Sequence, residues 1–251
     1  YRRRPTPRVV QLLANVDGNW IVHLQRTGRY AASVQAMLGS LDYLRRNKLY
    51  STMVLTYYNI GGTLEALGQP RQAADYWKQG QQLRSRAPQE GVLVLLASGL
   101  ALHYDADSTQ PDSARHYLNI TRELAATEAG QRYHFIYLWT QGKHELRQGR
   151  PRAAVALLEQ AVAEARQRGN IDDVNALLSD LGRGYSQLGN YPQARRYLLE
   201  GLQLMAKSGM PEQSAMYEYL AEVEEKSGHP AQALRYMRRL HMFKDSLGGV
   251  S

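Results

Sequence analysis

Apolar residues recur along this chain every three or four positions, in segments separated by short polar stretches. In residues 176–188 the apolar stripe consists of Leu177, Leu178, Leu181, Tyr185 and Leu188. The segment that follows carries its own stripe, made of Ala194, Tyr197, Leu198, Leu202 and Met205. A period of 3.6 residues is typical of amphipathic α-helices. The pattern therefore predicts two consecutive helices, each with one apolar face.

This two-helix pattern is repeated along the whole sequence. If Ala194 serves as a marker, equivalent small residues lie at Ser33, Ala73, Ala114, Ala154 and Ala233, with separations of 40, 41, 40, 40 and 39 residues. A period of this length is the signature of a repeat architecture. Six units are predicted, approximately 8–47, 48–87, 88–129, 130–169, 170–209 and 210–247, after a basic tail at 1–7.

Glycine and proline mark the junction of the two helices in most units. The glycines are Gly28, Gly68, Gly149, Gly189 and Gly228, and the prolines are Pro70, Pro111, Pro151, Pro192 and Pro230. Glycine accepts the left-handed conformation that ends a helix, and proline loses no hydrogen bond in the first turn of the next one. In the third unit the sequence DADSTQP replaces the short junction. Each unit is therefore predicted to be a helical hairpin.

Small residues on both helices favour close packing within each hairpin. Gly61, Gly142 and Gly182 lie on the predicted first helices, and the alanine markers lie on the second. Small side chains allow two helix backbones to approach each other. A single hairpin would leave one apolar side exposed, so the hairpins are expected to stack on one another in an all-α solenoid.

The motif Leu-Gly-x-x-Tyr-x-x-Leu-Gly followed by Ala and Tyr resembles the tetratricopeptide repeat. Here it consists of Leu181, Gly182, Tyr185, Leu188, Gly189, Ala194 and Tyr197. The resemblance implies a single domain over residues 1–251, a right-handed α-α superhelical solenoid of about six hairpins. The period exceeds the usual 34 residues of this repeat, so longer helices are expected.

The end of the chain, ALRYMRRLHMFKDSL, is similar to the close of long-period tetratricopeptide regions in bacterial sensor histidine kinases and related regulators. The similarity lies in Lys244, Asp245, Ser246 and Leu247. It implies the sensory or regulatory region of a bacterial signalling protein. Such a region is periplasmic or extracytoplasmic in a sensor and otherwise cytoplasmic, and the sequence alone does not decide the compartment.

The tetratricopeptide resemblance also implies which residues face the concave groove. Carried over by register, they are Tyr58, Asn59, Glu65, Leu96, Leu100, His103, Trp139, Lys143, Arg147, Arg183 and Gln187. Lys143 and Arg147 are like charges four residues apart on one helix, which is unfavourable unless an anion lies nearby. The expected partner is a protein or peptide segment with an apolar anchor and an acidic group. For Trp139 and the leucines, packing against the neighbouring hairpin is the alternative.

The apolar segment GVLVLLASGLALHY, residues 91–104, leaves further alternatives open. It is shorter than the roughly 20 residues that a membrane-spanning helix needs. A helix that is apolar around most of its circumference must be covered on most sides. A ligand, a second copy of the chain or a side chain could cover it. The first would suit a small-molecule-responsive regulator with a pocket between the third and fourth units, and the second an assembly scaffold that forms a homodimer.

Composition narrows the function further. The 251 residues have a formal net charge of +8 and include no cysteine, which excludes disulfides, thiolate metal sites and cysteine nucleophiles. The basic charge favours acidic partners, but the arginines are scattered among acidic residues. No groove-reading motif or basic-aromatic stripe for nucleic acid is present.

Two short motifs with possible chemistry do not hold up. DADST at 105–109 resembles a phosphatase nucleophile loop or a calcium loop, but it interrupts a helical hairpin and lacks the glycine and closing glutamate of a calcium site. HELRQ, which starts at His144, has Gln148 where a zinc protease has its second histidine. The sequence therefore predicts a non-catalytic interaction module with no cofactor and no metal site.

Overall fold

The computed structural model describes residues 29–87, 91–107, 109–169, 171–208 and 214–248, and every regular element in these ranges is a helix. The α-helices are α2 (Tyr30–Arg46), α3 (Tyr50–Ala66), α4 (Pro70–Gln81), α5 (Val92–Ala106), α6 (Pro111–Ala125), α7 (His134–Arg147), α8 (Pro151–Arg168), α9 (Ile171–Gln187), α10 (Tyr191–Ser208), α11 (Ser214–Lys226) and α12 (Pro230–Gly248). A 3-10 turn, η1 (Gln131–Tyr133), precedes α7. The all-α fold class is confirmed.

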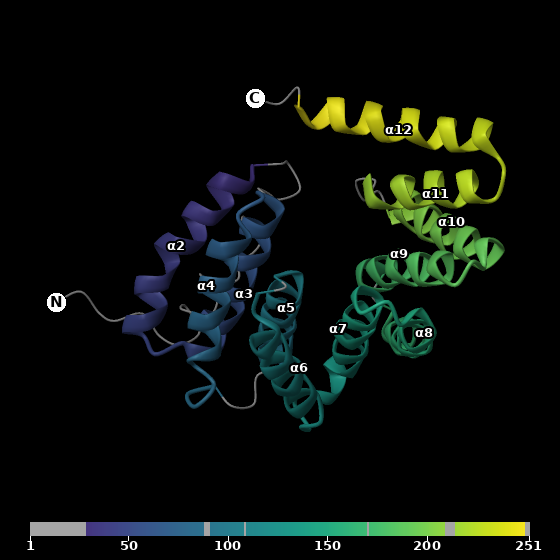
Figure 1. Cartoon of the computed structure of the whole chain (residues 1–251). Helices are drawn as coiled ribbons and strands as arrows, with labels where there is room; N and C mark the ends of the chain where they lie inside the picture. Colours follow the sequence, from purple (N-terminus) through teal and green to yellow (C-terminus); the bar gives the residue numbers. More distant parts are fainter. Residues whose placement is uncertain (1–28, 88–90, 108, 170, 209–213, 249–251) are drawn as a thin grey trace. The chain divides into compact units, whose positions relative to one another are not determined.

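Consecutive helices pack as antiparallel pairs (Figure 1). The pairs α3–α4, α5–α6, α9–α10 and α11–α12 are hairpins, and α7 and α8 meet where Gly142 lies against Leu158. Each hairpin also contacts its neighbour, through α2–α3, α4–α5, α8–α9 and α10–α11. The tandem hairpins predicted from the 40-residue period are therefore present. The predicted basic tail, the first helix of unit one and Gly28 lie outside the described residues.

The described junctions have the predicted geometry. Gly68, Gly149, Gly189 and Gly228 have φ between +68° and +79°, the left-handed region in which a Cβ is unfavourable. Pro70, Pro111, Pro151 and Pro230 begin the following helices, and Pro192 is the second residue of α10. These residues end one helix and start the next, as the sequence predicts.

The third junction uses a carboxylate in place of glycine. The Asp107 side chain accepts hydrogen bonds from the backbone N–H of Thr109 (3.0 Å), the Thr109 hydroxyl (2.6 Å) and the Gln110 amide (2.9 Å). These bonds favour the ionised form and lower the pKa of Asp107 to about 2. Asp107 thus organises the turn between α5 and α6.

Glycine on the first helix of a hairpin receives a large side chain from the second. A Cβ on Gly61 would lie 2.0 Å from Nε1 of Trp77, and one on Gly182 would lie 2.5 Å from Cγ of Leu198. The Trp77 indole also donates a hydrogen bond to the Tyr58 carbonyl, at 3.2 Å. The close approach inferred from the small residues is therefore confirmed.

The recurring tyrosine of the second helix pairs with a tyrosine of the first helix. The pairs are Tyr57–Tyr76, Tyr104–Tyr117, Tyr185–Tyr197 and Tyr217–Tyr236, with ring centroids 5.5 to 6.3 Å apart. Aromatic pairs at this separation stabilise a contact beyond simple burial. In the fourth hairpin Leu157 occupies the tyrosine position of the second helix.

The chain divides into two compact units, unit 1 up to Tyr137 and unit 2 from Leu138. The core of unit 2 includes a cluster formed by Ala194, Leu198, Met205, Met216, Leu220 and Val223. No helix in the described ranges is both long enough and apolar enough to cross a membrane.

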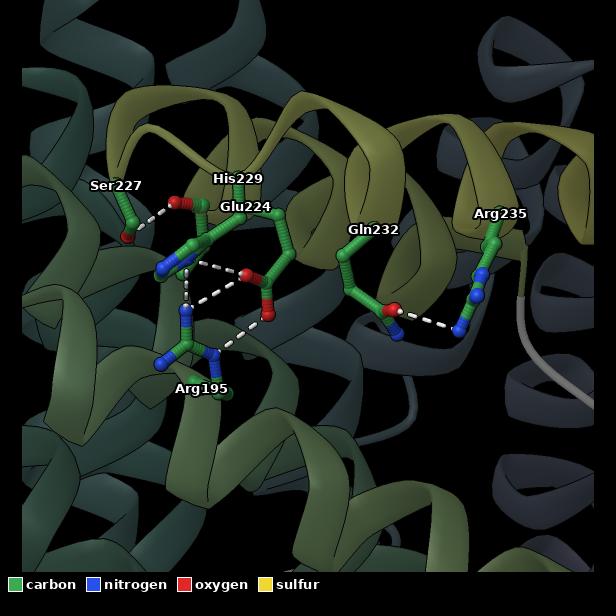
Figure 2. Close-up of polar contacts among 7 residues, drawn as sticks. Arg195, Glu224, Ser227, His229, Gln232 and Arg235 are labelled. Atoms are coloured by element: carbon green, nitrogen blue, oxygen red, sulfur yellow. Dashed lines mark hydrogen bonds and ion pairs between the residues drawn. The ribbon is translucent and has the colours of Figure 1, made fainter.

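A buried ion pair joins α10 to the last hairpin (Figure 2). The Arg195 guanidinium donates two hydrogen bonds of 2.6 Å to the Glu224 carboxylate, and Nδ1 of His229 lies 3.1 Å from the same carboxylate. The hydrogen bonds from Arg195 are the main reason why the pKa of Glu224 is lowered. Because Glu224 is buried, this pair fixes how α11 sits on α10.

Candidate interaction surface

The predicted groove residues of α3 are at least partly accessible in unit 1. Tyr58 and Asn59 are half-buried, and Glu65 is exposed. Their backbone carbonyls already have partners, because Trp77 donates to Tyr58 and the Thr63 hydroxyl donates to Asn59 at 2.7 Å. The α3 backbone that carries Tyr58 and Asn59 is therefore held in place by these bonds.

The predicted leucines of α5 belong to the core of unit 1. Leu96 and Leu100 are fully buried, and Leu96 lies against Gly80 of α4. Helix α5 contacts α3, α4, α6 and η1, and the Trp77 ring packs against Gly99. The cover that the apolar sequence requires therefore comes from neighbouring helices of the same chain. Of the interpretations left open for these leucines, packing is the one that the structure shows.

His103 lies beside a small polar cluster in unit 1. Burial, and secondarily the nearby Lys78 ammonium, lowers the pKa of His103. Nζ of Lys78 lies 5.4 Å from the centroid of the Tyr104 ring, and a hydrogen bond with Tyr104 raises the pKa of Lys78. Tyr104 in turn stacks on Tyr117 at 5.6 Å. His103 therefore borders a hairpin contact and is half-buried there.

In unit 2 the structure brings two predicted residues, Trp139 and Lys143, to one carboxylate. The Trp139 indole N–H donates a hydrogen bond of 2.7 Å to Oδ2 of Asp180, and Nζ of Lys143 lies 3.6 Å from the same oxygen. Nζ of Lys143 also lies 4.8 Å from the centroid of the Trp139 ring. Asp180 is 7% exposed, so the three groups hold one another in a largely dry contact between α7 and α9.

The other predicted residues of unit 2 continue the same stripes. Arg147 is one turn beyond Lys143 on α7 and is exposed. On α9, Arg183 is one turn beyond Asp180 and half-buried, and Gln187 is one further turn along and exposed. We call these six residues the Trp139 surface: Trp139, Lys143, Arg147, Asp180, Arg183 and Gln187.

Asp180 was not among the predicted groove residues. The sequence does contain a signal for it, because Asp180 follows Trp139 by 41 residues, one repeat period plus one position. Register alone predicts the equivalent residue Ser179, whereas the contact is made by its neighbour. The anion expected beside Lys143 is therefore supplied by the chain itself, from the next hairpin.

Among the residues that the structure describes, no three histidine, aspartate or glutamate side chains gather as a metal site would require. The carboxylate of Asp107, in the sequence that resembles a calcium loop, is bonded to Thr109 and Gln110. The geometry of the Trp139 surface suits non-covalent binding, since it offers an aromatic ring and basic groups.

No protein-family model matches the sequence, and no curated protein matches it at a significant level. Solved structures do match the fold. A chain of the APC/C hetero-tetramer Cut9–Hcn1 is 13% identical with a TM-score of 0.69, and the match covers 92% of this chain and 40% of that one. This chain therefore spans less than half the length of that relative.

Two further structures match along nearly their whole length. The type IV pilus biogenesis factor PilW is 14% identical with a TM-score of 0.57, covering 92% of this chain and 93% of PilW. The tetratricopeptide-repeat protein TTC0263 of Thermus thermophilus is 19% identical with a TM-score of 0.61, covering 84% of this chain and 98% of TTC0263. At these identities the likeness shows the fold, which is that of a tetratricopeptide-like helical solenoid.

Proposed function

We propose that the protein is a non-catalytic protein-interaction module and that the Trp139 surface binds a peptide segment of a partner. The observation that carries the proposal is the fixed orientation of Trp139, whose indole N–H is bonded to Asp180 and whose ring lies near Lys143. A rigid aromatic side chain costs little conformational entropy on binding and is a common interface anchor. One of the matched chains belongs to a protein hetero-tetramer, which supports this use of the fold.

The partner segment has an apolar residue and an acidic group. The apolar residue contacts Trp139, and the acidic group lies near Arg147 and Arg183. Lys143 is already paired with Asp180, so the two arginines are better placed to attract an anion than the lysine is. An acidic peptide group would then add a charge-assisted hydrogen bond at a half-exposed site.

Selection of a random twelve-residue peptide library on the full chain tests this function. We expect the enriched peptides to share an apolar residue beside an aspartate or glutamate. Their affinity should fall at least tenfold in Trp139→Ala and in Arg147→Glu combined with Arg183→Glu. Arg152→Glu on the exposed face of α8 is the matched charge control and should leave affinity unchanged. Enriched peptides that bind Trp139→Ala as well as the original chain would refute the proposal.

We place this module in the sensory or regulatory region of a bacterial signalling protein. The support is the similarity of Lys244, Asp245, Ser246 and Leu247, at the end of α12, to the close of such regions. The gene that encodes the chain is expected to encode a kinase or another output domain as well. A gene whose remaining coding sequence specifies an unrelated enzyme would contradict this role.

A further inference from the structure

Helix α12 exposes large apolar side chains on the face opposite its hairpin partner. Tyr236 of α12 packs on Tyr217 of α11, at 6.3 Å between ring centroids. Leu234 and Met237 point elsewhere and are 49% and 56% exposed. Together with Arg238 and His241 they have the spacing i, i+3, i+4 and i+7, which places all four on one side of a helix. We call these four residues the α12 face.

The repeat shows what normally happens at these positions. Met237 follows the marker Ala233 by four residues, and Leu198 follows Ala194 by the same number. Leu198 is fully buried, in one cluster with Met216 and Leu220 of the next hairpin. The equivalent residues of two earlier hairpins, Leu158 and Trp77, are also buried. The position that is buried in these hairpins is therefore more than half exposed in α12.

The remaining positions of the α12 face have become basic. Arg238 and His241 stand where α10 has Leu199 and Leu202, both packed against the cluster of unit 2. No aspartate or glutamate occurs between Pro230 and Phe243, whereas acidic residues occur within the first fourteen residues of every other second helix. These are Asp42 in α2, Asp75 in α4, Asp112 and Glu123 in α6, Glu159 and Glu164 in α8, and Glu200 in α10.

This change of charge identifies the kind of partner. A face that only needed to be wetted could carry either sign of charge, but here like charges lie three and four positions apart at Arg235, Arg238 and Arg239. Such spacing opposes helix formation by a few tenths of a kcal/mol per pair. An acidic partner would remove that cost. A second copy of α12 would bring the same positive charges together, which disfavours a symmetric dimer through this face.

We propose that the α12 face binds an acidic amphipathic helix of a partner protein. The helix lies on α12 as α11 lies on α10, with its apolar residues on Leu234 and Met237 and its carboxylates near Arg238. The contact between Arg195 and Glu224, two hydrogen bonds of 2.6 Å, is the precedent within the molecule for an arginine of a second helix pairing with a carboxylate of the next first helix. This surface is separate from the Trp139 surface.

Fluorescence anisotropy with the full chain tests this proposal. The probe is a labelled peptide with the α11 sequence SAMYEYLAEVEEK, held helical by a side-chain lactam bridge because so short a helix is marginal in water. A second probe replaces Glu218, Glu222, Glu224 and Glu225 with lysine. We expect saturable binding of the acidic probe only. Met237→Gln and Arg238→Glu should each weaken it at least tenfold.

Two controls isolate the α12 face. Leu55→Gln removes an exposed leucine of α3 and should leave the affinity unchanged, as should Trp139→Ala, so the result is independent of the function proposed above. Unaltered circular dichroism shows that each variant is folded. Equal binding of both probes, no saturable binding, or full binding by Met237→Gln would overturn the proposal.

Other occupants of the α12 face give different results. If sedimentation shows a dimer that Met237→Gln converts to a monomer, the face binds a second copy and the proposal is wrong. Vesicles containing anionic lipid are the remaining comparison. If they bind the chain through Met237 and compete with the acidic probe at lower concentrations, the face binds membranes and the proposal is wrong.

Discussion

At the scale of single residues, side-chain hydrogen bonds replace glycine where the repeat departs from its pattern. The sequence DADSTQP predicts a longer junction, and its composition is compatible with several acidic roles. Only the coordinates show that Asp107, rather than Asp112, makes the bonds that close the turn. Asp112 lies in the first turn of α6, as predicted, with Arg115 3.5 Å away. Sequence indicates the loop and its acidity, but hydrogen-bond geometry decides which carboxylate acts.

The pKa of Asp107 provides a test at this scale. We expect a carboxyl pKa of about 2 in the folded protein, measured by a ¹³C NMR pH titration. Because the folded-state pKa lies below the ordinary value near 3.9, the contribution of this group to stability is present above that value. It is lost as the pH falls towards 2. Thr109→Ala removes the hydroxyl donor, so the pKa should move up towards its ordinary range. An unchanged pKa in that variant would show that the hydroxyl bond does not hold the turn.

At the scale of helices, the sequence predicts the hairpins well because their ends and crossings depend on local chemistry. Gly68 and Pro70 determine one junction whatever the surroundings are, since φ preference and a missing N–H are properties of the residues themselves. The tyrosine pairs are different. Tyr76 is recognisable as a repeated position, but its partner Tyr57 is defined only by how the two helices cross.

Two neighbouring glycines on α3 separate close packing from helix propensity. Gly61→Ala would place a methyl group 2.0 Å from the Trp77 ring nitrogen, whereas a Cβ on Gly62 meets nothing within 4 Å. We expect Gly61→Ala to lower the free energy of unfolding by about 1–3 kcal/mol. Gly62→Ala should raise it by up to about 1 kcal/mol, because alanine is the better helix former. Urea denaturation followed by circular dichroism measures both. Equal effects of the two substitutions would show that Trp77 can move aside at little cost.

At the scale of the whole molecule, the sequence predicts the solenoid class but not which helix faces are dry. Leu96 and Leu100 are placed in the groove by register, yet they are fully buried because α5 has neighbours on several sides. Trp139 and Lys143 are accessible to different degrees, although the same register selects them. Whether a position in a repeat is wet depends on the adjacent hairpins, which periodicity does not encode.

Leu96 and Leu55 distinguish a core position from a surface position in unit 1. Leu96→Asp would bury a carboxylate with no partner and should destabilise the chain by more than about 4 kcal/mol. Leu55→Asp changes a residue that is 43% exposed and should alter stability by less than about 1 kcal/mol. Thermal unfolding followed by far-ultraviolet circular dichroism compares the two. If Leu96→Asp remained as stable as the original chain but changed its oligomeric state, Leu96 would belong to a dimer interface instead of the core.

The Trp139–Asp180 hydrogen bond joins residues of two successive hairpins, so neither hairpin contains the complete recognition surface. A pulling force that separates α7 from α9 would release the indole while both helices remained intact. The partner would then dissociate before any helix unwinds. Recognition at this place would thereby respond to mechanical load, and its sensitivity would reside in a single bond of 2.7 Å.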